Sequence, residues 1–173
     1  MPANNIEDRD EKLQESFSRV LYLAENDKRL GLLLGPPDCG KSECLRQIEQ
    51  QMNERGHRTI LLDLTSETDV ASKLLEKICS RQCFDDSPGS KWKRLTDHLL
   101  QIPQSNDSVD KTPILFLDHL DRYDQHVIQE IVRLIRFHDV HRISRLFIAC
   151  ANSEYLFSLD ARLLDRIDMK LVL

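Results

Sequence analysis

The stretch that decides the fold is GPPDCGKS, at residues 35–42. It matches the pattern G-x-x-x-x-G-K-[ST] at every fixed position. Before it stands the continuous apolar run RLGLLLG, 29–35, which is typical of a buried strand. After it, the segment 41–54 places its apolar residues on one helical face. A strand, a glycine-bearing loop and a helix in this order favour a loop that wraps around phosphate.

The residue types of this loop indicate its chemistry. Three of the five glycines fall within residues 31–40, which predicts unusual backbone geometry there. Backbone N–H groups and the positive end of the helix can then face a β-phosphate. Lys41 adds a point charge between the β- and γ-phosphates, and the Ser42 hydroxyl is a hard ligand suited to Mg²⁺. The residues expected to bind the nucleotide are Gly35, Pro36, Pro37, Asp38, Cys39, Gly40, Lys41, Ser42 and Glu43.

Strand and helix signals alternate along the rest of the chain. Strands are predicted at 29–35, 59–64, 113–117, 145–151 and 167–173, and helices at 9–26, 41–54, 69–79, 91–102 and 124–138. The polar stretches 80–90 and 104–112 are predicted to be loops. Alternation of this kind predicts an α/β fold: a three-layer P-loop domain around a central parallel sheet of about five strands. We expect one domain over 1–173, with 1–28 as a helical lead-in.

A phosphate loop also needs an acidic residue that organises magnesium beside it. The segment PILFLDHLD, 113–121, contains such a residue. Its apolar strand ends at Asp118, which we expect to hold the Mg²⁺ shell together with Ser42. Asp121, three residues later, either reaches the site through a water or caps the next helix, a role that Asp124 fits better.

These residues together resemble the AAA+ superfamily of P-loop ATPases. Within it the chain is most similar to the group that joins the origin-recognition initiators, the ExeA ATPases of type II secretion and the TniB transposition ATPases. The resemblance covers about residues 10–173 and is carried by RLGLLLGPPDCGKSECLRQI, TILLDL, ILFLDHLD and LFIACANSEYL. It implies ATP as the nucleotide, Mg²⁺ as the metal, and Asp118 as the Walker B acid.

The resemblance also assigns roles beyond the phosphate loop. Asn152, at the end of the fourth predicted strand, takes the position called sensor 1, which orients the lytic water. Either Arg162 or Arg166 takes the position of an arginine that reaches a neighbour's γ-phosphate; the alternative is a solvated arginine or one paired with Asp160 or Asp165.

Two features depart from the family pattern. His119 stands where many hydrolytic members have glutamate. Either neutral His119 acts as the base near pH 7, or it only fills the place of the glutamate, and hydrolysis is then slow. The chain ends at Leu173, which leaves no room for the family's helical lid after the last strand, so the expected fold is a core with the lid absent.

Composition and charge limit the kinds of partner and the cellular compartment that we expect. With 29 acidic and 24 basic residues, the net charge of −5 argues against a surface that binds nucleic acid throughout. The segment 133–145 is a local basic group, because it contains several arginines and histidines and only one acidic residue, Asp139. This group either binds phosphate or is a solvated helix end. No apolar run reaches the length of a membrane span, and the polar N-terminus with five cysteines favours a reducing, cytoplasmic compartment.

The interpretation is a Mg²⁺-dependent AAA+ ATPase with slow hydrolysis, coupled to a protein partner, a homo-oligomer or DNA. Two alternatives stay open. One is an ATP-bound scaffold without effective hydrolysis, favoured by His119 and the missing lid. The other is an ATP-dependent DNA-binding regulator, favoured by the basic group at 133–145.

Overall fold

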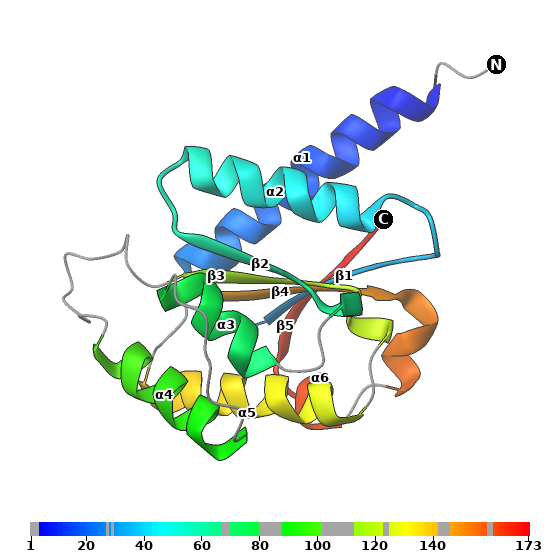
Figure 1. Cartoon of the computed structure of the whole chain (residues 1–173). Coiled ribbons are helices and arrows are strands. Elements are labelled where there is room, and N and C mark those ends of the chain that lie inside the picture. Colours follow the sequence, from blue (N-terminus) through cyan, green and yellow to red (C-terminus); the bar gives the residue numbers. More distant parts are fainter. Residues whose placement is uncertain are drawn as a thin grey trace.

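A five-stranded parallel sheet forms the centre of the molecule (Figure 1). The computed structural model describes residues 4–26, 28, 30–66, 70–79, 88–101, 113–122, 125–141, 146–158 and 161–173. The spatial order of the strands is β2-β3-β4-β1-β5. Their bounds are β1 Leu30–Gly35, β2 Thr59–Asp63, β3 Ile114–Asp118, β4 Leu146–Asn152 and β5 Ile167–Val172. The prediction of a parallel sheet of about five strands is confirmed.

The α-helices are α1 Asn4–Glu25, α2 Lys41–Glu54, α3 Val70–Cys79, α4 Pro88–Gln101, α5 Gln125–His141 and α6 Ala161–Leu164. Short 3₁₀ turns follow three of the strands: η1 Leu64–Ser66, η2 Leu120–Arg122 and η3 Ser153–Ser158. The predicted loop 80–90 is wrong at its end, since α4 already begins at Pro88, a residue whose fixed φ suits the start of a helix. The other predicted loop, 104–112, lies outside the described residues. Among the described helices none is long and apolar enough to cross a membrane.

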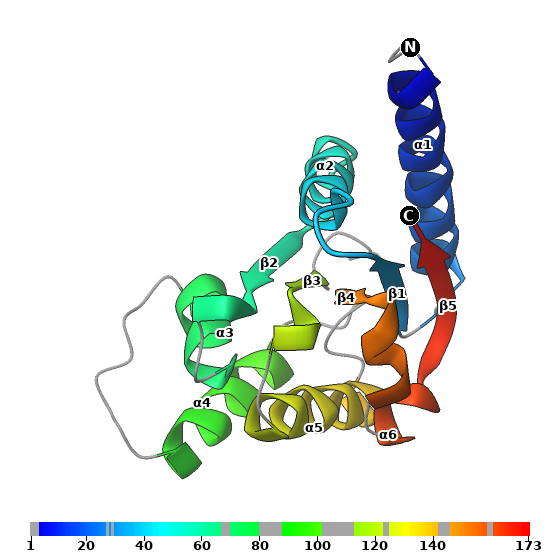
Figure 2. The same ribbon diagram turned by 90° about the vertical axis from the view of Figure 1, so that its right-hand side faces the viewer.

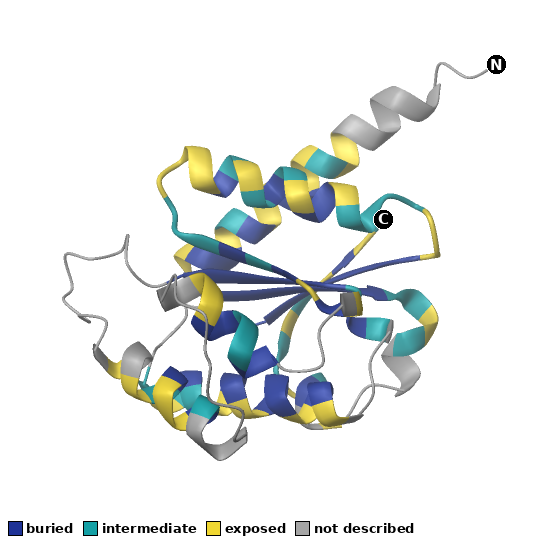
Figure 3. Ribbon diagram, in the orientation of Figure 1, coloured by how far each residue is buried: buried dark blue, intermediate teal, exposed yellow. Residues whose placement is uncertain are grey.

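Helices cover both faces of the sheet, which gives three layers (Figures 1 and 2). One apolar cluster joins α1 and α2 to the sheet, through residues such as Val20, Ile48 and Phe116. The other joins α3, α4 and α5 to the opposite face, through residues such as Leu74, Leu95 and Phe147. Strands buried on both faces read as continuous apolar runs, and β1 and β3 are buried at every position (Figure 3).

The edge strand β5 differs from the central strands because its residues alternate between more and less exposed positions. It pairs with β1 only, and the backbone N–H of Leu173 continues that pairing by donating to the carbonyl of Leu34 at 2.8 Å. The chain therefore ends beside the carboxyl end of β1. Since all five strands are parallel, the residues that follow β1, β2, β3 and β4 meet at this same edge of the sheet.

The reason for glycine differs among the three clustered positions, and only one of them needs a positive φ. Gly40 has a φ of 94°, in the region that favours glycine. Gly31 is required by packing, since a Cβ there would lie 2.8 Å from atoms of both Ile148 and Leu23. Gly35 is required by the loop, because a Cβ would lie 2.5 Å from Cys39 Sγ. The predicted unusual backbone geometry is confirmed at Gly40 and at Asp38, whose φ is 60°, whereas Gly31 and Gly35 do not have a positive φ.

A buried carboxylate holds the three helices of the second face together. Glu130 on α5 accepts the backbone N–H of Val70, the first residue of α3, at 2.9 Å. Its other oxygen accepts the Trp92 indole N–H of α4 at 3.0 Å. The Val70 N–H is one of the donors that a helix leaves unpaired at its start, so Glu130 caps α3 from another helix. Trp92 itself is buried.

We expect Glu130→Ala to lower the free energy of unfolding by about 2–4 kcal/mol, because two buried donors lose their acceptor. Glu130→Gln keeps the shape and one acceptor oxygen, so its loss should be smaller. Gln129→Ala, an exposed neighbour on α5, is the matched control and should change the stability by less than about 0.5 kcal/mol. Urea unfolding curves measure all three; equal stability of Glu130→Ala and wild type would contradict the capping role.

Candidate nucleotide-binding site

The loop between β1 and α2 presents unpaired backbone N–H groups. Gly40 is the N-cap residue of α2 and supplies no side-chain cap. The first N–H groups of the helix have no partner within it, and without a capping side chain they face the loop. Asp38, with a φ of 60°, and Gly40 both adopt left-handed backbone conformations, which turn successive amides toward the inside of the loop. This is the arrangement that binds phosphate oxygens.

The ammonium of Lys41 lies folded over this loop. Its Nζ donates to the carbonyl of Gly35 at 2.9 Å and to that of Pro36 at 2.6 Å, and lies 3.8 Å from Cys39 Sγ. Neutral carbonyls hold the charge without a carboxylate partner, so Lys41 remains available as a cation for an anionic ligand.

Ser42 and Asp118 meet although they lie 76 residues apart in the sequence, and the Ser42 hydroxyl donates to Asp118 Oδ1 at 3.0 Å. The Asp118 side chain is almost fully buried, with 1% of the residue exposed, and its Oδ1 also accepts the His119 backbone N–H at 2.9 Å. A hydroxyl and a carboxylate are the hard oxygen ligands that Mg²⁺ prefers. Among the described residues no group of three or more His, Cys, Asp or Glu side chains is placed to hold a metal ion.

His119 connects this pair to β2. Its Nε2 lies 3.5 Å from Ser42 Oγ, and its Nδ1 lies 3.1 Å from Asp63 Oδ1. Burial alone would raise the pKa of Asp63, but hydrogen bonds from Thr65 and His119 outweigh it and hold the pKa below its ordinary value. His119 has a φ of 59°, an uncommon conformation for a non-glycine residue that is found at functional sites.

Asn152 is fixed at the end of β4 by its neighbours. Its backbone N–H donates to Asp121 Oδ2 at 3.0 Å, and its side-chain oxygen accepts the N–H of Glu154 at 3.4 Å. Asp121 also contributes, after burial, to a raised pKa of Tyr155. Asp121 lines the cleft, and its two predicted roles stay predictions; Asp124 lies outside the described residues.

These groups surround one cleft of about 500 Å³. Its lining residues come from the loop, α2 and the ends of β3 and β4: Pro37, Asp38, Gly40, Lys41, Ser42, Glu43, Arg46, Asp118, His119, Asp121, Cys150 and Asn152. Most of the predicted site residues are thus brought together. Gly35, Pro36 and Cys39 belong to the loop but are not among the lining residues.

Three neighbours of the cleft were not predicted from the sequence. Arg46 lines it from α2, and nothing in the helical pattern distinguishes this exposed arginine from others. Cys150 also lines the cleft. Burial, and to a smaller extent the charge of Asp118, raise the pKa of its thiol well above the ordinary value, so the thiol stays protonated. Asp63 had a usable signal, because it ends an apolar strand just as Asp118 does.

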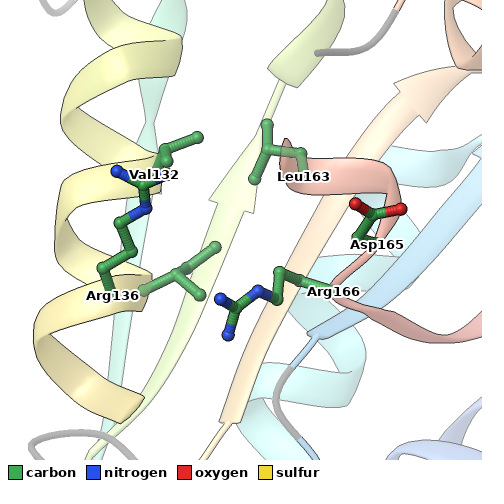
Figure 4. A pocket seen from close by; sticks show the side chains of 6 residues that line it. Val132, Arg136, Leu163, Asp165 and Arg166 are labelled. Carbon is green, nitrogen blue, oxygen red and sulfur yellow. The ribbon is translucent and has the colours of Figure 1, made fainter. Parts of the chain in front are cut away.

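The predicted arginine position lies away from this cleft. Arg166 precedes β5, at the edge where the strands begin, and forms an ion pair with Asp139 of α5. It shares a small pocket of about 160 Å³ with Arg136, Val132 and Leu163 (Figure 4). The side chain of Arg162 lies outside the described residues.

In the part of the chain that the structure describes, members of the basic group at 133–145 contact aromatic rings, while Arg133 and Arg136 are exposed on α5. The Arg133 guanidinium stacks over the Trp92 ring at 4.5 Å, and His138 is buried against Phe147. Arg142 and Arg145 lie outside the described residues.

The parallel sheet, the phosphate loop and the cleft define a P-loop nucleoside-triphosphate-binding domain. The model of the AAA domain family matches residues 24–157, more than half of the chain, and the chain belongs to this family. The resemblance to AAA+ ATPases is thereby confirmed. No curated protein matches the chain.

Solved structures with a similar fold include replication initiators. Cdc6p from Pyrobaculum aerophilum is similar over 94% of this chain and 45% of its own, at 18% identity and a TM-score of 0.69. Drosophila ORC bound to AT-rich DNA and Cdc6 is similar over 92% and 52%, at 14% identity and 0.65. AMPPCP-bound DnaA from Aquifex aeolicus is similar over 92% and 46%, at 16% identity and 0.54. The chain thus spans about half the length of each of these three proteins.

We expect Lys41→Ala to weaken ATP binding about ten- to a hundredfold, because a charge-assisted contact to phosphate is lost. The fold should persist, since the Lys41 ammonium bonds within the loop, to the carbonyls of Gly35 and Pro36 and to Cys39 Sγ. Lys93→Ala, which removes an exposed lysine of α4, is the matched control. Titration with a fluorescent ATP analogue measures the affinity. Equal affinity of a folded Lys41→Ala variant and wild type would contradict the assignment of the loop.

Proposed function

We propose that the chain is a Mg²⁺-dependent ATPase that hydrolyses ATP slowly. The observation that carries the proposal is the 3.0 Å hydrogen bond between Ser42 and the buried Asp118, formed beside the open amides of the phosphate loop. It brings the two predicted magnesium ligands together where the loop would place the β- and γ-phosphates. ATP as the nucleotide rests on membership of the AAA family.

The proposed reaction assigns separate roles to the loop, Lys41, Ser42, Asp118, His119 and Asn152. Lys41 and the loop amides would hold the phosphates, and Ser42 with Asp118 would hold Mg²⁺, which supplies Lewis-acid stabilisation of phosphate charge. His119 and Asn152 line the cleft and would accept hydrogen bonds from the attacking water. An imidazole in place of the family's usual glutamate is the reason to expect slow turnover.

The nucleotide cycle would control an interaction with another macromolecule. We propose a protein partner or a second copy of this chain first, acting in the cytoplasm with residues 1–173 as one core domain. DNA is supported by likeness of fold to a structure that contains DNA, but two members of the basic group, Arg133 and His138, contact aromatic rings. A salt-dependent DNA titration with and without ATP separates these partners.

The second candidate is an ATP-bound scaffold without effective hydrolysis. His119 favours it, because no carboxylate follows Asp118. Single-turnover phosphate release distinguishes the two: the ATPase converts bound ATP within minutes to hours in Mg²⁺ and not in EDTA, whereas the scaffold retains it in both.

We expect Asp118→Asn to keep the fold and most of the ATP affinity but to reduce Mg²⁺-dependent turnover about a hundredfold or more. The amide is nearly isosteric, yet it removes the charge that holds the metal, and metal chemistry contributes several kcal/mol to such reactions. Steady-state phosphate release over a Mg²⁺ titration measures the effect.

Asp97→Asn is the matched control, the same chemical change at an exposed residue of α4, and should behave as wild type. Wild-type turnover by Asp118→Asn would mean that Asp118 does not hold the metal.

A further inference from the structure

Asp63 and His119 lie side by side because β2 and β3 are paired in parallel. In the register of this pair, Asp63 stands opposite Asp118, and His119 is the next residue after the strand. Both therefore emerge at the edge of the sheet that bears the cleft. His119 lines the cleft, whereas Asp63 is not among the lining residues.

The imidazole is held between Asp63 and Ser42. Its Nδ1 lies 3.1 Å from Asp63 Oδ1 and 3.7 Å from Asp118 Oδ2, while its Nε2 points to the cleft side, 3.5 Å from Ser42 Oγ. Ionised carboxylates only accept hydrogen bonds, so Nδ1 must carry the hydrogen. In a neutral imidazole this leaves Nε2 as an acceptor, and the structure aims that acceptor at the cleft.

Asp63 is itself fixed by its own turn. Its Oδ1 accepts the backbone N–H of Thr65 at 3.0 Å and the Thr65 hydroxyl at 2.8 Å, and the same oxygen faces His119. A carboxylate held by two local donors cannot rotate without losing both bonds. The position of the acceptor for His119 Nδ1 is thus set before any ligand enters the cleft.

We propose that Asp63 is a positioning residue that fixes the orientation and the Nδ1–H tautomer of His119, so that Nε2 can accept a hydrogen bond from the attacking water. The inference rests on the proposed ATPase function and adds to it a residue outside the cleft. In this role Asp63 acts only through His119. Its effect on turnover must therefore disappear when the imidazole is removed.

A different result is expected if Asp63 only holds the ends of β2 and β3 together. Asp63 would then matter for stability whether or not the imidazole is present. The Asp63 side chain is 48% exposed and that of His119 24%, so the pair can be changed without opening the core. The two roles can therefore be separated by experiment.

The test compares single-turnover phosphate release, at saturating ATP and Mg²⁺, in Asp63→Ala, Asp63→Asn and the control Asp97→Ala. We expect Asp63→Ala to slow release about tenfold or more while ATP affinity and the unfolding midpoint stay near wild type. Asp63→Asn should retain most of the rate. The Thr65 N–H, a donor only, keeps the amide oxygen rather than the amide nitrogen facing His119.

The dependence on His119 is tested in a His119→Gly background, where glycine removes the ring and suits the φ of 59°. Asp63→Ala should have no further effect there. An equal slowing in both backgrounds, or a wild-type rate in Asp63→Ala, would overturn the proposal.

The tautomer gives a readout that does not need hydrolysis. Nitrogen-15 NMR of the histidines at alkaline pH, with the His119 signals identified by their loss in His119→Gly, should show Nδ1 protonated in wild type and a shift toward the Nε2–H form in Asp63→Ala. An Nε2–H tautomer in wild type would overturn the proposal even if ATP is hydrolysed. An Nδ1–H tautomer in a chain that binds ATP but releases no phosphate would instead reject the proposed hydrolysis and keep the placement of His119 by Asp63.

Discussion

The hydrogen bond between Ser42 and Asp118 is the contact on which the rest of the site depends. A carboxylate buried to 1% exposure is costly unless donors surround it. The donors that the structure shows to Asp118 are the Ser42 hydroxyl and the His119 N–H, both on the same oxygen. Asp118 thus joins the start of α2 to the end of β3 across the intervening strand β4, and it retains acceptor capacity on the side of the cleft. The apolar layers on both faces of the sheet keep this arrangement rigid.

The sequence was sufficient to predict the elements and the phosphate loop, because both are local signals. Burial on two faces makes β1 and β3 continuous apolar runs, and the loop motif has a fixed spacing. The contact between Asp63 and His119 was not predictable, since it spans 56 residues and depends on β2 lying next to β3. The hydrogen bonds of Glu130 with Val70 and Trp92 were not predictable for the same reason. They depend on how α3, α4 and α5 pack together, and the hydrophobic periodicity of each helix does not specify that packing.

Charge patterns were the least informative part of the sequence. The basic group at 133–145 predicts a charged face only if its members point the same way. On α5, however, Arg133 stacks on the Trp92 ring and His138 packs on Phe147, so both serve the second apolar layer. Arg166 is likewise bound to Asp139. A linear run of cations therefore says little about partners until the helix that carries it is placed.

The backbone conformation of His119 is related to the presence of histidine in place of the family's usual glutamate. A φ of 59° costs about 1 kcal/mol for most residues with a Cβ and is best tolerated by glycine, asparagine, aspartate and histidine. In this chain the cost is offset by the N–H bond to Asp118 and by the contact of the ring with Asp63. A glutamate at this position would bear a larger backbone cost than histidine, and its carboxylate would face the carboxylate of Asp63. The histidine, the left-handed turn and the aspartate at the end of β2 are thus mutually dependent, which explains why an imidazole rather than a carboxylate follows Asp118.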